Sequence, residues 1–233
     1  MIKPGGHDIL FAMSNKSDSI IQAMNSKQNL NQKNSTKQLG YWTGKFGNDF
    51  IKRNSDTKYF AKRKSFFEQI VKKYNIRSIL EIGCGIGGNL KIIAEIDPSI
   101  KLAAIEPNKK AISIARKNIP KAEIIDGNIF NVNIARKFDL VFTSVVLIHI
   151  ADEDLPIALE KIYKASSKYI LAIEYYSKKR KVVLYRGLVD ALFKRPYDEV
   201  YLNKFPALKM IESKRLTTRR SFARCKYFLF EKK

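Results

Sequence analysis

The sequence predicts an α/β fold in which a mostly parallel sheet carries helices on both faces and ends in an antiparallel hairpin. Short apolar runs of strand type alternate with helix-like segments from about residue 76 onward. A glycine-rich stretch, S-I-L-E-I-G-C-G-I-G-G-N-L (78–90), joins the first run to the first of these helices. Two more strand-like runs close the chain with no helix between them, and we expect these to pair as the hairpin.

The pattern assigns each element in turn. Strand-type runs predict parallel strands at 78–82, 102–106, 122–126, 140–144 and 169–173, and hairpin strands at 208–215 and 224–230. Apolar residues at helical spacing predict helices at 58–74, 88–95, 108–118 and 154–166.

The chain divides into three parts. Residues 1–38 are polar and lack periodicity, so we expect a flexible lead. Residues 39–75 begin with a stretch rich in glycine and aromatic residues and form an N-terminal cap. Residues 76–233 form the core, and an insertion at about 174–204, dense in Tyr and Arg, is expected to act as a lid over an acceptor.

Composition narrows the possible classes of protein. Hydrophobic residues make up 45% of the 233, which can fill the core of one domain. The two cysteines, Cys84 and Cys225, argue against a disulfide framework and a cysteine-based zinc site, and we expect no metal. No apolar run reaches 18 residues and no signal peptide is evident, so we expect no membrane span and a cytoplasmic protein.

The formal net charge is +22, which would attract nucleic acid or other polyanions. The sharpest basic cluster lies between Lys214 and Lys226, on the predicted hairpin. This pattern fits a phosphate-contacting surface for RNA or an acidic small molecule, but it also fits a solvated basic face.

The glycine-rich stretch predicts a site for a nucleotide-like ligand. Glycines let the backbone approach a ligand closely, and the following helix offers free N–H groups. Glu81 precedes the first glycine, and Glu106 follows 25 residues later at the tip of the second strand, where an acid can accept from ribose hydroxyls. The glycines do not follow the dinucleotide spacing G-x-G-x-x-G. A carboxylate before them suits the amino group and sulfonium of S-adenosylmethionine better than a pyrophosphate. A dinucleotide, or no ligand, remains an alternative.

With these residues in view, the chain resembles class I S-adenosylmethionine-dependent methyltransferases, whose sheet is Rossmann-like. The resemblance covers about 76–232 and rests on E-I-G-C-G-I-G, Glu106, the D-G-N turn and F-D-L-V-F. More closely, the chain is similar to the pseudaminic acid biosynthesis-associated methylases. That likeness adds W-T-G-K-F-G-N-D-F-I-K-R-N (42–54), V-L-I-H-I (146–150), E-Y-Y (174–176), Y-R-G (185–187) and L-F-K-R-P-Y (192–197).

The resemblance implies a donor site for S-adenosyl-L-methionine. Its residues would be Trp42, Glu81, Gly83, Cys84, Gly85, Gly87, Glu106, Pro107, Asn108, Gly127, Asn128, Ile129, Ser144 and Val145. Glu81 would steer the amino group, and Trp42 with Phe46 could close over the sulfonium. Many members have Gly-Asp after the third strand, where the acid accepts from the adenine amine. This chain has Asn128 there, so an amide oxygen or Asp126 would have to accept instead.

Methyl transfer needs an aligned acceptor and, for a hydroxyl, a proton acceptor. His149 is the best base, because it follows the fourth strand and only two histidines occur. A histidine in L-I-H-I could equally be a packed core residue. Tyr175 and Tyr185 are further catalytic candidates. Acceptor contacts are expected from Glu174, Tyr176 and Arg186.

The sequence therefore predicts an O- or N-methyltransferase acting on a small, anionic acceptor such as a sugar, a sugar nucleotide or an amine. The basic charge keeps a methyltransferase for RNA or protein as an alternative. A non-catalytic module that binds S-adenosylmethionine is a further one. No N-P-P-Y or D-P-P-Y follows the fourth strand, which disfavours methylation of an exocyclic base amine. The sequence leaves the oligomeric state open.

Overall fold

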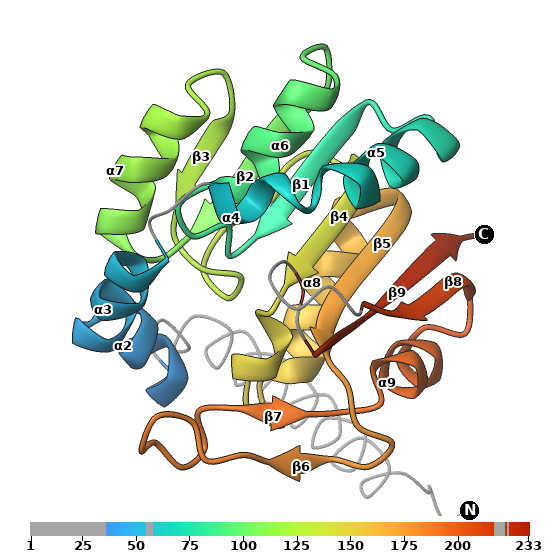
Figure 1. Ribbon diagram of the computed structural model, residues 1–233. Helices are drawn as coiled ribbons and strands as arrows, with labels where there is room; N and C mark the ends of the chain where they lie inside the picture. Colours follow the sequence, from blue (N-terminus) through green and yellow to red (C-terminus); the bar gives the residue numbers. More distant parts are fainter. Residues whose placement is uncertain (1–35, 55–57, 217–221, 223) are drawn as a thin grey trace, which may run out of the picture. The chain divides into compact units, whose positions relative to one another are not determined.

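The computed structural model describes residues 36–54, 58–216, 222 and 224–233, of which residues 37–233 belong to one compact unit (Figure 1). The predicted lead at 1–38 lies almost wholly outside the described residues. The described chain is helical from Lys37.

The predicted sheet is confirmed. Seven strands are hydrogen-bonded in the order β3-β2-β1-β4-β5-β9-β8. The first five in this order run parallel, and β9 lies antiparallel between β5 and β8. The bounds are β1 Ser78–Ile82, β2 Lys101–Glu106, β3 Glu123–Asp126, β4 Phe138–Ser144, β5 Ser166–Tyr175, β8 Leu208–Arg215 and β9 Cys225–Lys232.

The strand order reverses at β1, which lies between β2 and β4. Ile82, the last residue of β1, pairs with Ile105 on one side and Thr143 on the other. The turns after β1, β2 and β4 therefore leave the sheet at the same edge. In open α/β sheets, ligands bind at this edge, where the strand order reverses.

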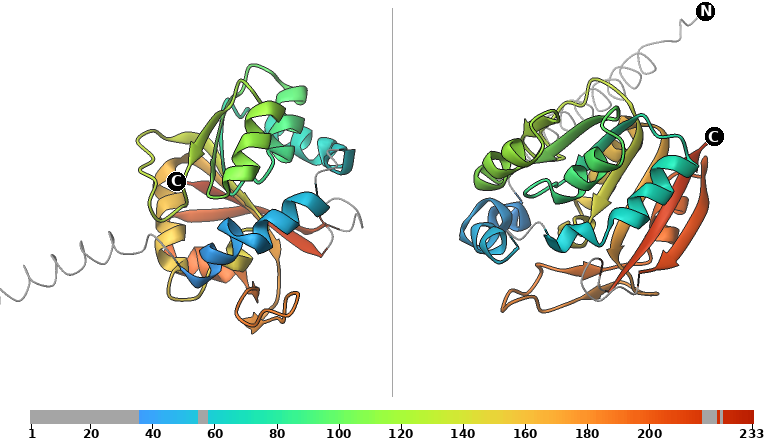
Figure 2. Two further views of the ribbon diagram at one scale, coloured as in Figure 1. Left: turned by 90° about the vertical axis from the view of Figure 1, so that its left-hand side faces the viewer. Right: turned by 45° about the horizontal axis from the view of Figure 1, so that its top comes forward.

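Helices cover both faces of the sheet (Figure 2). Helices α5 (Lys64–Lys73), α6 (Gly88–Ile96) and α7 (Lys109–Asn118) pack on one face, and α8 (Leu155–Ala165) and α9 (Tyr197–Lys204) on the other. Burial on both faces explains why β1 and β2 read as nearly continuous apolar runs.

The N-terminal cap consists of α2 (Lys37–Thr43), α3 (Lys45–Arg53) and α4 (Lys58–Ala61). The prediction of one helix at 58–74 is wrong, because the chain breaks between α4 and α5 at Lys62 and Arg63. The Arg63 guanidinium lies over the rings of Phe60, at 4.6 Å, and Phe222, at 4.3 Å. The Phe60 ring in turn packs on Gly88. Phe222 and Gly88 are distant in sequence, so periodicity alone cannot reveal the break.

The insertion contains regular structure that the sequence pattern did not predict. A short antiparallel pair, β6 (Lys181–Val182) and β7 (Phe193–Lys194), is followed by α9. A 3-10 turn, η1 (Leu147–His149), follows β4 and contacts β7. In the described part of the chain, no helix is both long enough and apolar enough to span a membrane.

Candidate functional site

The glycine loop after β1 turns sharply at the ligand-binding edge. Gly83, Gly85 and Gly87 have φ angles of 72°, 55° and 79°, which favour glycine. A Cβ on Gly83 would lie 2.7 Å from Cγ2 of Val146, so this part of the loop is packed. A Cβ on Gly85 would meet no atom within 4 Å. The loop is therefore open at Gly85, where a ligand can approach the backbone.

Glu106 ties the glycine loop to the end of β2. Its Oε2 accepts from the Gly85 N–H at 2.8 Å, and its Oε1 accepts from the Asn108 N–H at 2.9 Å. Burial raises the pKa of Glu106, and the two amides oppose that shift. The carboxylate thus lies next to the open glycine, as an acceptor of ribose hydroxyls should.

Asn108 joins this site to the N-terminal cap. Its Oδ1 accepts from two amides of the first turn of α7, a standard N-cap. Its Nδ2 donates to the Trp42 carbonyl at 2.8 Å and to Oδ1 of Asn48 at 3.2 Å. One side chain thereby starts α7 and holds α2 and α3 against it.

Glu81 is part of a buried polar chain beneath the glycine loop. Nδ2 of Asn89 donates to Glu81 Oε1 at 2.6 Å, and Arg63 donates to Asn89 Oδ1 at 2.6 Å. Glu81 is 1% exposed, and its Oε2 has no hydrogen-bond partner in the described structure. Burial raises the pKa of Glu81 to about 8. A buried carboxylate oxygen without a partner is costly, and a bound cation would relieve that cost.

The turn after β3 departs from the sequence expectation. Asn128 Oδ1 accepts from the Phe130 N–H at 2.8 Å and from the Asn131 N–H at 3.3 Å. Asp126 is exposed and ion-paired with Lys109. The amide oxygen expected to accept from adenine is therefore used by the turn itself. In this geometry, the backbone of the turn, rather than the Asn128 oxygen, is available to contact the adenine ring.

Strain marks the turn after β4. Val145 has a φ of 62°, and a positive φ at a β-branched residue is a genuine outlier. Strained backbone of this kind clusters at functional sites. Ser144 precedes Val145 and is partly buried. Both predicted donor contacts thus lie at the ligand-binding edge.

Glu174 has a different role from the one expected. It is fully buried, and its carboxylate accepts from the backbone N–H groups of Val146, Leu147 and Ile148 at 3.2, 3.1 and 3.4 Å. Burial raises its pKa to about 7. Glu174 therefore holds the strained turn after β4 through these three hydrogen bonds, and it offers no exposed surface to an acceptor.

His149 lies at the end of η1 with a defined orientation. Its Nδ1 is 2.6 Å from the Ala191 carbonyl, so Nδ1 carries the proton and Nε2 keeps its lone pair. Burial lowers the pKa of His149 to about 4. The imidazole is consequently neutral at physiological pH and can accept a proton at Nε2.

Four aromatic rings from three segments form a closed group, which we call the aromatic quartet: Trp42, Phe46, His149 and Tyr185. Ring centroids lie 4.5 Å apart for Trp42 and His149, and 5.3 Å apart for Trp42 and Phe46. Tyr185 completes the group, 5.6 Å from His149 and 5.8 Å from Phe46. The cap and the insertion therefore meet over the turn after β4.

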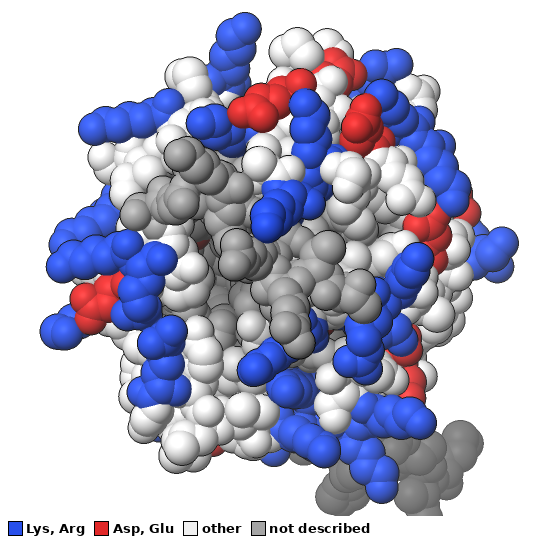
Figure 3. Space-filling view, in the orientation of Figure 1, with Lys and Arg blue, Asp and Glu red and all other residues white. Residues whose placement is uncertain are grey.

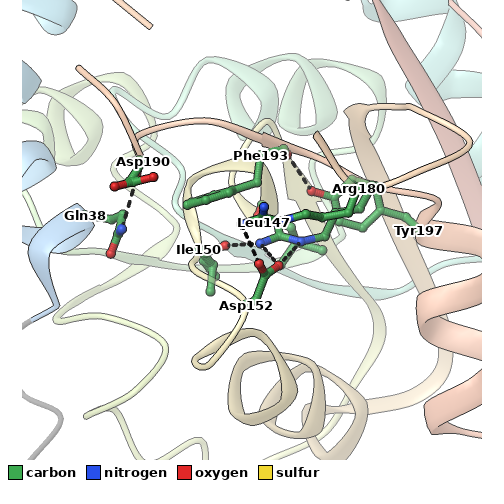
Figure 4. Close-up of polar contacts among 9 residues, drawn as sticks. Gln38, Leu147, Ile150, Asp152, Arg180, Asp190, Phe193 and Tyr197 are labelled. Atoms are coloured by element: carbon green, nitrogen blue, oxygen red, sulfur yellow. Dashed lines mark hydrogen bonds and ion pairs between the residues drawn. The ribbon is translucent and has the colours of Figure 1, made fainter. Parts of the chain in front are cut away.

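Arg195 anchors the insertion to that turn, a role the sequence did not reveal. Arg195 is 2% exposed, and its guanidinium donates to the carbonyls of Leu147, at 3.2 Å, and Ile150, at 2.7 Å. It also forms two bonds with Oδ1 of Asp152, at 2.9 and 2.7 Å. Arg180 pairs with the other oxygen of this carboxylate at 2.7 Å (Figure 4). The only sequence signal was the motif L-F-K-R-P-Y, which contains Arg195.

The remaining candidates lie in different places. The Tyr176 ring packs near Phe228 and beneath the Lys226 ammonium, so it belongs to the β9 side of the sheet. Arg186 is exposed at the tip of the insertion. Tyr175 is partly buried at the end of β5, and Cys84, Pro107, Gly127 and Ile129 stay with the loops at the ligand-binding edge. The structure thus brings together the donor candidates, His149 and Tyr185, but neither Tyr176 nor Arg186.

Known proteins share this architecture. Residues 79–168 match the family described as a methyltransferase domain. A protein of Alkaliphilus oremlandii (strain OhILAs), described as "Uncharacterized methyltransferase", is 31% identical over 96 residues, covering 40% of this chain and 44% of that protein. The chain thus covers less than half of that relative.

Solved methyltransferases have the same fold at low sequence identity. The magnesium protoporphyrin IX methyltransferase of Synechocystis PCC 6803, with bound SAM, gives a TM-score of 0.65 at 10% identity, covering 85% of this chain and 99% of that one. The sugar N-methyltransferase KedS8 of Streptoalloteichus sp ATCC 53650 gives 0.60 at 16% identity, covering 82% and 94%. At these identities, the likeness supports the class I methyltransferase fold.

Proposed function

We propose that this chain, which carries a class I methyltransferase domain with S-adenosyl-L-methionine as its cofactor, transfers a methyl group to oxygen or nitrogen of a small, anionic acceptor. One observation carries the proposal. Glu106 is held beside the open glycine of the loop by two backbone amides, at the edge where the strand order reverses. The domain match over 79–168 spans this arrangement.

The residues present suit the donor. The Glu81 oxygen without a partner would take the amino group, the Gly85 backbone would border the methionine part, and Glu106 would accept from the ribose. When bound, the donor supplies an activated methyl group on a sulfonium. The aromatic ring of Trp42 lies beside the His149 ring, and an aromatic face can stabilise a nearby positive charge such as the sulfonium.

His149 is the proposed base for a hydroxyl or ammonium acceptor. The bond from Nδ1 to the Ala191 carbonyl fixes the ring, and the unprotonated Nε2 is the atom that would take the acceptor's proton. Tyr185 lies beside it and could orient the acceptor. Two sugar methyltransferases among the structural relatives support a sugar acceptor, as does the resemblance to pseudaminic acid biosynthesis-associated methylases.

The first test is calorimetric titration with S-adenosylmethionine and S-adenosylhomocysteine. Glu106→Ala should weaken binding about 10- to 100-fold, because hydrogen bonds to a charged group contribute about 1.5–3 kcal/mol. Glu123→Ala is the matched control, since Glu123 is an exposed carboxylate of β3 that pairs with Arg136. Absence of binding to both compounds would overturn the proposal and favour a dinucleotide. Binding by the wild type justifies an acceptor screen that begins with nucleotide sugars.

A methyltransferase for RNA or protein is the second candidate, favoured by the many basic side chains visible on the molecular surface (Figure 3). Its signature would be retention on heparin and a steep loss of RNA binding with added salt. Donor binding without turnover on any acceptor would instead indicate a non-catalytic module.

A further inference from the structure

The insertion at 174–204 contains a hairpin whose tip is a tight turn at residues 186 and 187. Tyr185 and Leu188 exchange both backbone hydrogen bonds, each 3.0 Å long, so Arg186 and Gly187 form a two-residue turn. Both turn residues have positive φ, 52° and 81°, as a type I′ turn requires. Residues 185–188 are therefore held by regular hairpin geometry. Farther along, Val182 pairs with Phe193 and the Val183 N–H donates to the Leu192 carbonyl at 2.9 Å, so Leu184 alone lies opposite the three residues 189–191.

The two faces of this hairpin differ from those of an ordinary surface hairpin. Val183 and Tyr185 are partly buried and pack against the core, and Leu188 is partly buried. The alternate residues point outward, and they are aliphatic: Val182 is 39% exposed, Leu184 67% and Val189 61%. A solvent-facing strand usually carries polar side chains at these positions.

Leu184 and Val189 are the two most exposed of these side chains. In sequence they directly flank the bridged pair Tyr185 and Leu188, one on each side of the turn. The remaining strongly exposed large aliphatic residue of the described chain, Met210, lies on β8. The apolar surface is thus concentrated at the tip.

Exposed basic residues lie along the hairpin, from its base to its turn. Lys178, Lys179, Lys181 and Arg186 are all exposed, and the sequence from 175 to 189 contains no acidic residue. Arg180, in the same run, is ion-paired with Asp152 and holds the base of the hairpin to the turn after β4. The hairpin therefore carries exposed aliphatic side chains and exposed cationic groups, and the one neighbouring acid, Asp190, lies 4.0 Å from the Lys37 ammonium.

We propose that this hairpin docks on an anionic lipid bilayer. Aliphatic side chains can enter the boundary between headgroups and acyl chains, while lysine and arginine contact lipid phosphates. An acidic soluble partner would satisfy the cations but would leave the exposed aliphatic side chains unexplained. Because Tyr185 on the inner face contacts His149, docking would hold the candidate acceptor side near the bilayer surface.

The test is co-sedimentation of the full chain with vesicles of phosphatidylcholine and phosphatidylglycerol in equal parts, compared with vesicles of phosphatidylcholine alone. We expect binding to the anionic vesicles only. The double variant Leu184→Asp, Val189→Asp should lower it about tenfold or more. Met210→Asp, which places one such charge on β8, should bind like the wild type.

The basic residues are tested in the same way. Lys178, Lys179 and Lys181→Gln should weaken binding, whereas Lys101, Lys117 and Lys121→Gln remove the same charge elsewhere and should have a smaller effect. Donor calorimetry on every variant reports an intact core and separates failure of docking from failure of the proposed reaction. The proposal is overturned if no vesicles are bound, or if the tip variant binds as well as the wild type. It is also overturned if the tip variant abolishes self-association in gel filtration without vesicles, since a second copy would then cover the tip.

Discussion

The hydrogen bonds around Glu81 indicate a carboxylic acid that changes protonation when a cation arrives. Its folded-state pKa of about 8 lies above the ordinary 4.5, because it is fully buried. The charged groups nearest to it are Arg63, which acts through Asn89, and Glu106. A bound ammonium group beside Oε2 would favour the ionised form.

We therefore predict that donor binding releases a proton from Glu81. Between pH 6 and 8, the donor affinity should rise with pH, by at most about tenfold per unit, because one proton is linked. Calorimetry in two buffers of different ionisation heat measures the number of protons released. Glu81→Gln should remove this release, and the difference between the two proteins separates it from ionisation of the ligand. Equal release by both proteins would assign the proton to another group.

His149 should remain neutral at pH values well below 6.5, the ordinary pKa of a histidine. Its pKa is lowered to about 4 by burial, so the proton NMR signal of its ring should titrate below pH 5. His7→Gln removes the other histidine of the sequence and leaves one signal to follow. With an acceptor from the screen, His149→Asn should lower kcat about 100-fold and leave the donor Kd unchanged, as expected for loss of a base. A titration midpoint near pH 6.5 would show that the His149 ring is exposed to solvent and not buried.

At the scale of elements, the joint between α2 and α3 is the tightest part of the cap. A Cβ on Gly47 would lie 1.9 Å from the Trp42 carbonyl oxygen, the same oxygen that accepts from Asn108. The Trp42 carbonyl belongs to the backbone, so it cannot move away from an added Cβ as the end of a flexible side chain could. The position of α2, and with it the ring of Trp42, therefore depends on glycine at 47.

We predict that Gly47→Ala destabilises the protein by about 1–3 kcal/mol, the usual cost of overpacking. Gly40→Ala is the control, because a Cβ there meets no atom within 4 Å and alanine favours a helix by up to ~1 kcal/mol. Urea unfolding measures both free energies. Fluorescence of Trp42, the single tryptophan, should shift to longer wavelength only in the Gly47 variant. Equal stability of the two variants would show that the joint yields without cost.

The elements also show which information the sequence carries. The strands at 78–82 and 208–215 were predicted with their observed bounds, because apolar runs and turns are local signals. The break before α5 and the role of Arg195 depend on partners far away in the chain, as in the bonds of Arg195 to Leu147 and Ile150. The pair β6 and β7 is local, but each strand has only two residues, too few for a pattern. In the site, Glu106 was recognisable from its spacing. The use of Glu174 by the turn after β4, and of Asn128 by its own turn, was not, because it depends on backbone N–H groups brought together by folding.

For the whole molecule, the buried carboxylates determine how stability responds to pH. Lysine and arginine outnumber aspartate and glutamate by 44 to 22, and many acids are held in surface ion pairs that contribute little. Glu81 and Glu174 differ from these because they are fully buried, with pKa values raised to about 8 and about 7. In the unfolded chain, both would ionise near 4.5.

A group whose pKa is higher in the folded state destabilises the fold as it ionises, so the free energy of unfolding should fall as pH rises from about 4.5 toward 8. His149 opposes this trend only below pH 6.5, its ordinary pKa. In that range the histidine of the unfolded chain is protonated, whereas the buried His149 of the folded protein stays neutral. Above pH 6.5, the carboxylates alone act, and we expect a loss on the order of 2 kcal/mol by pH 8. Urea unfolding at the two pH values measures this loss, and Glu81→Gln should remove most of it. The exposed Glu123→Gln should leave the loss unchanged; a flat profile in the wild type would mean that cations or water already compensate the buried charges.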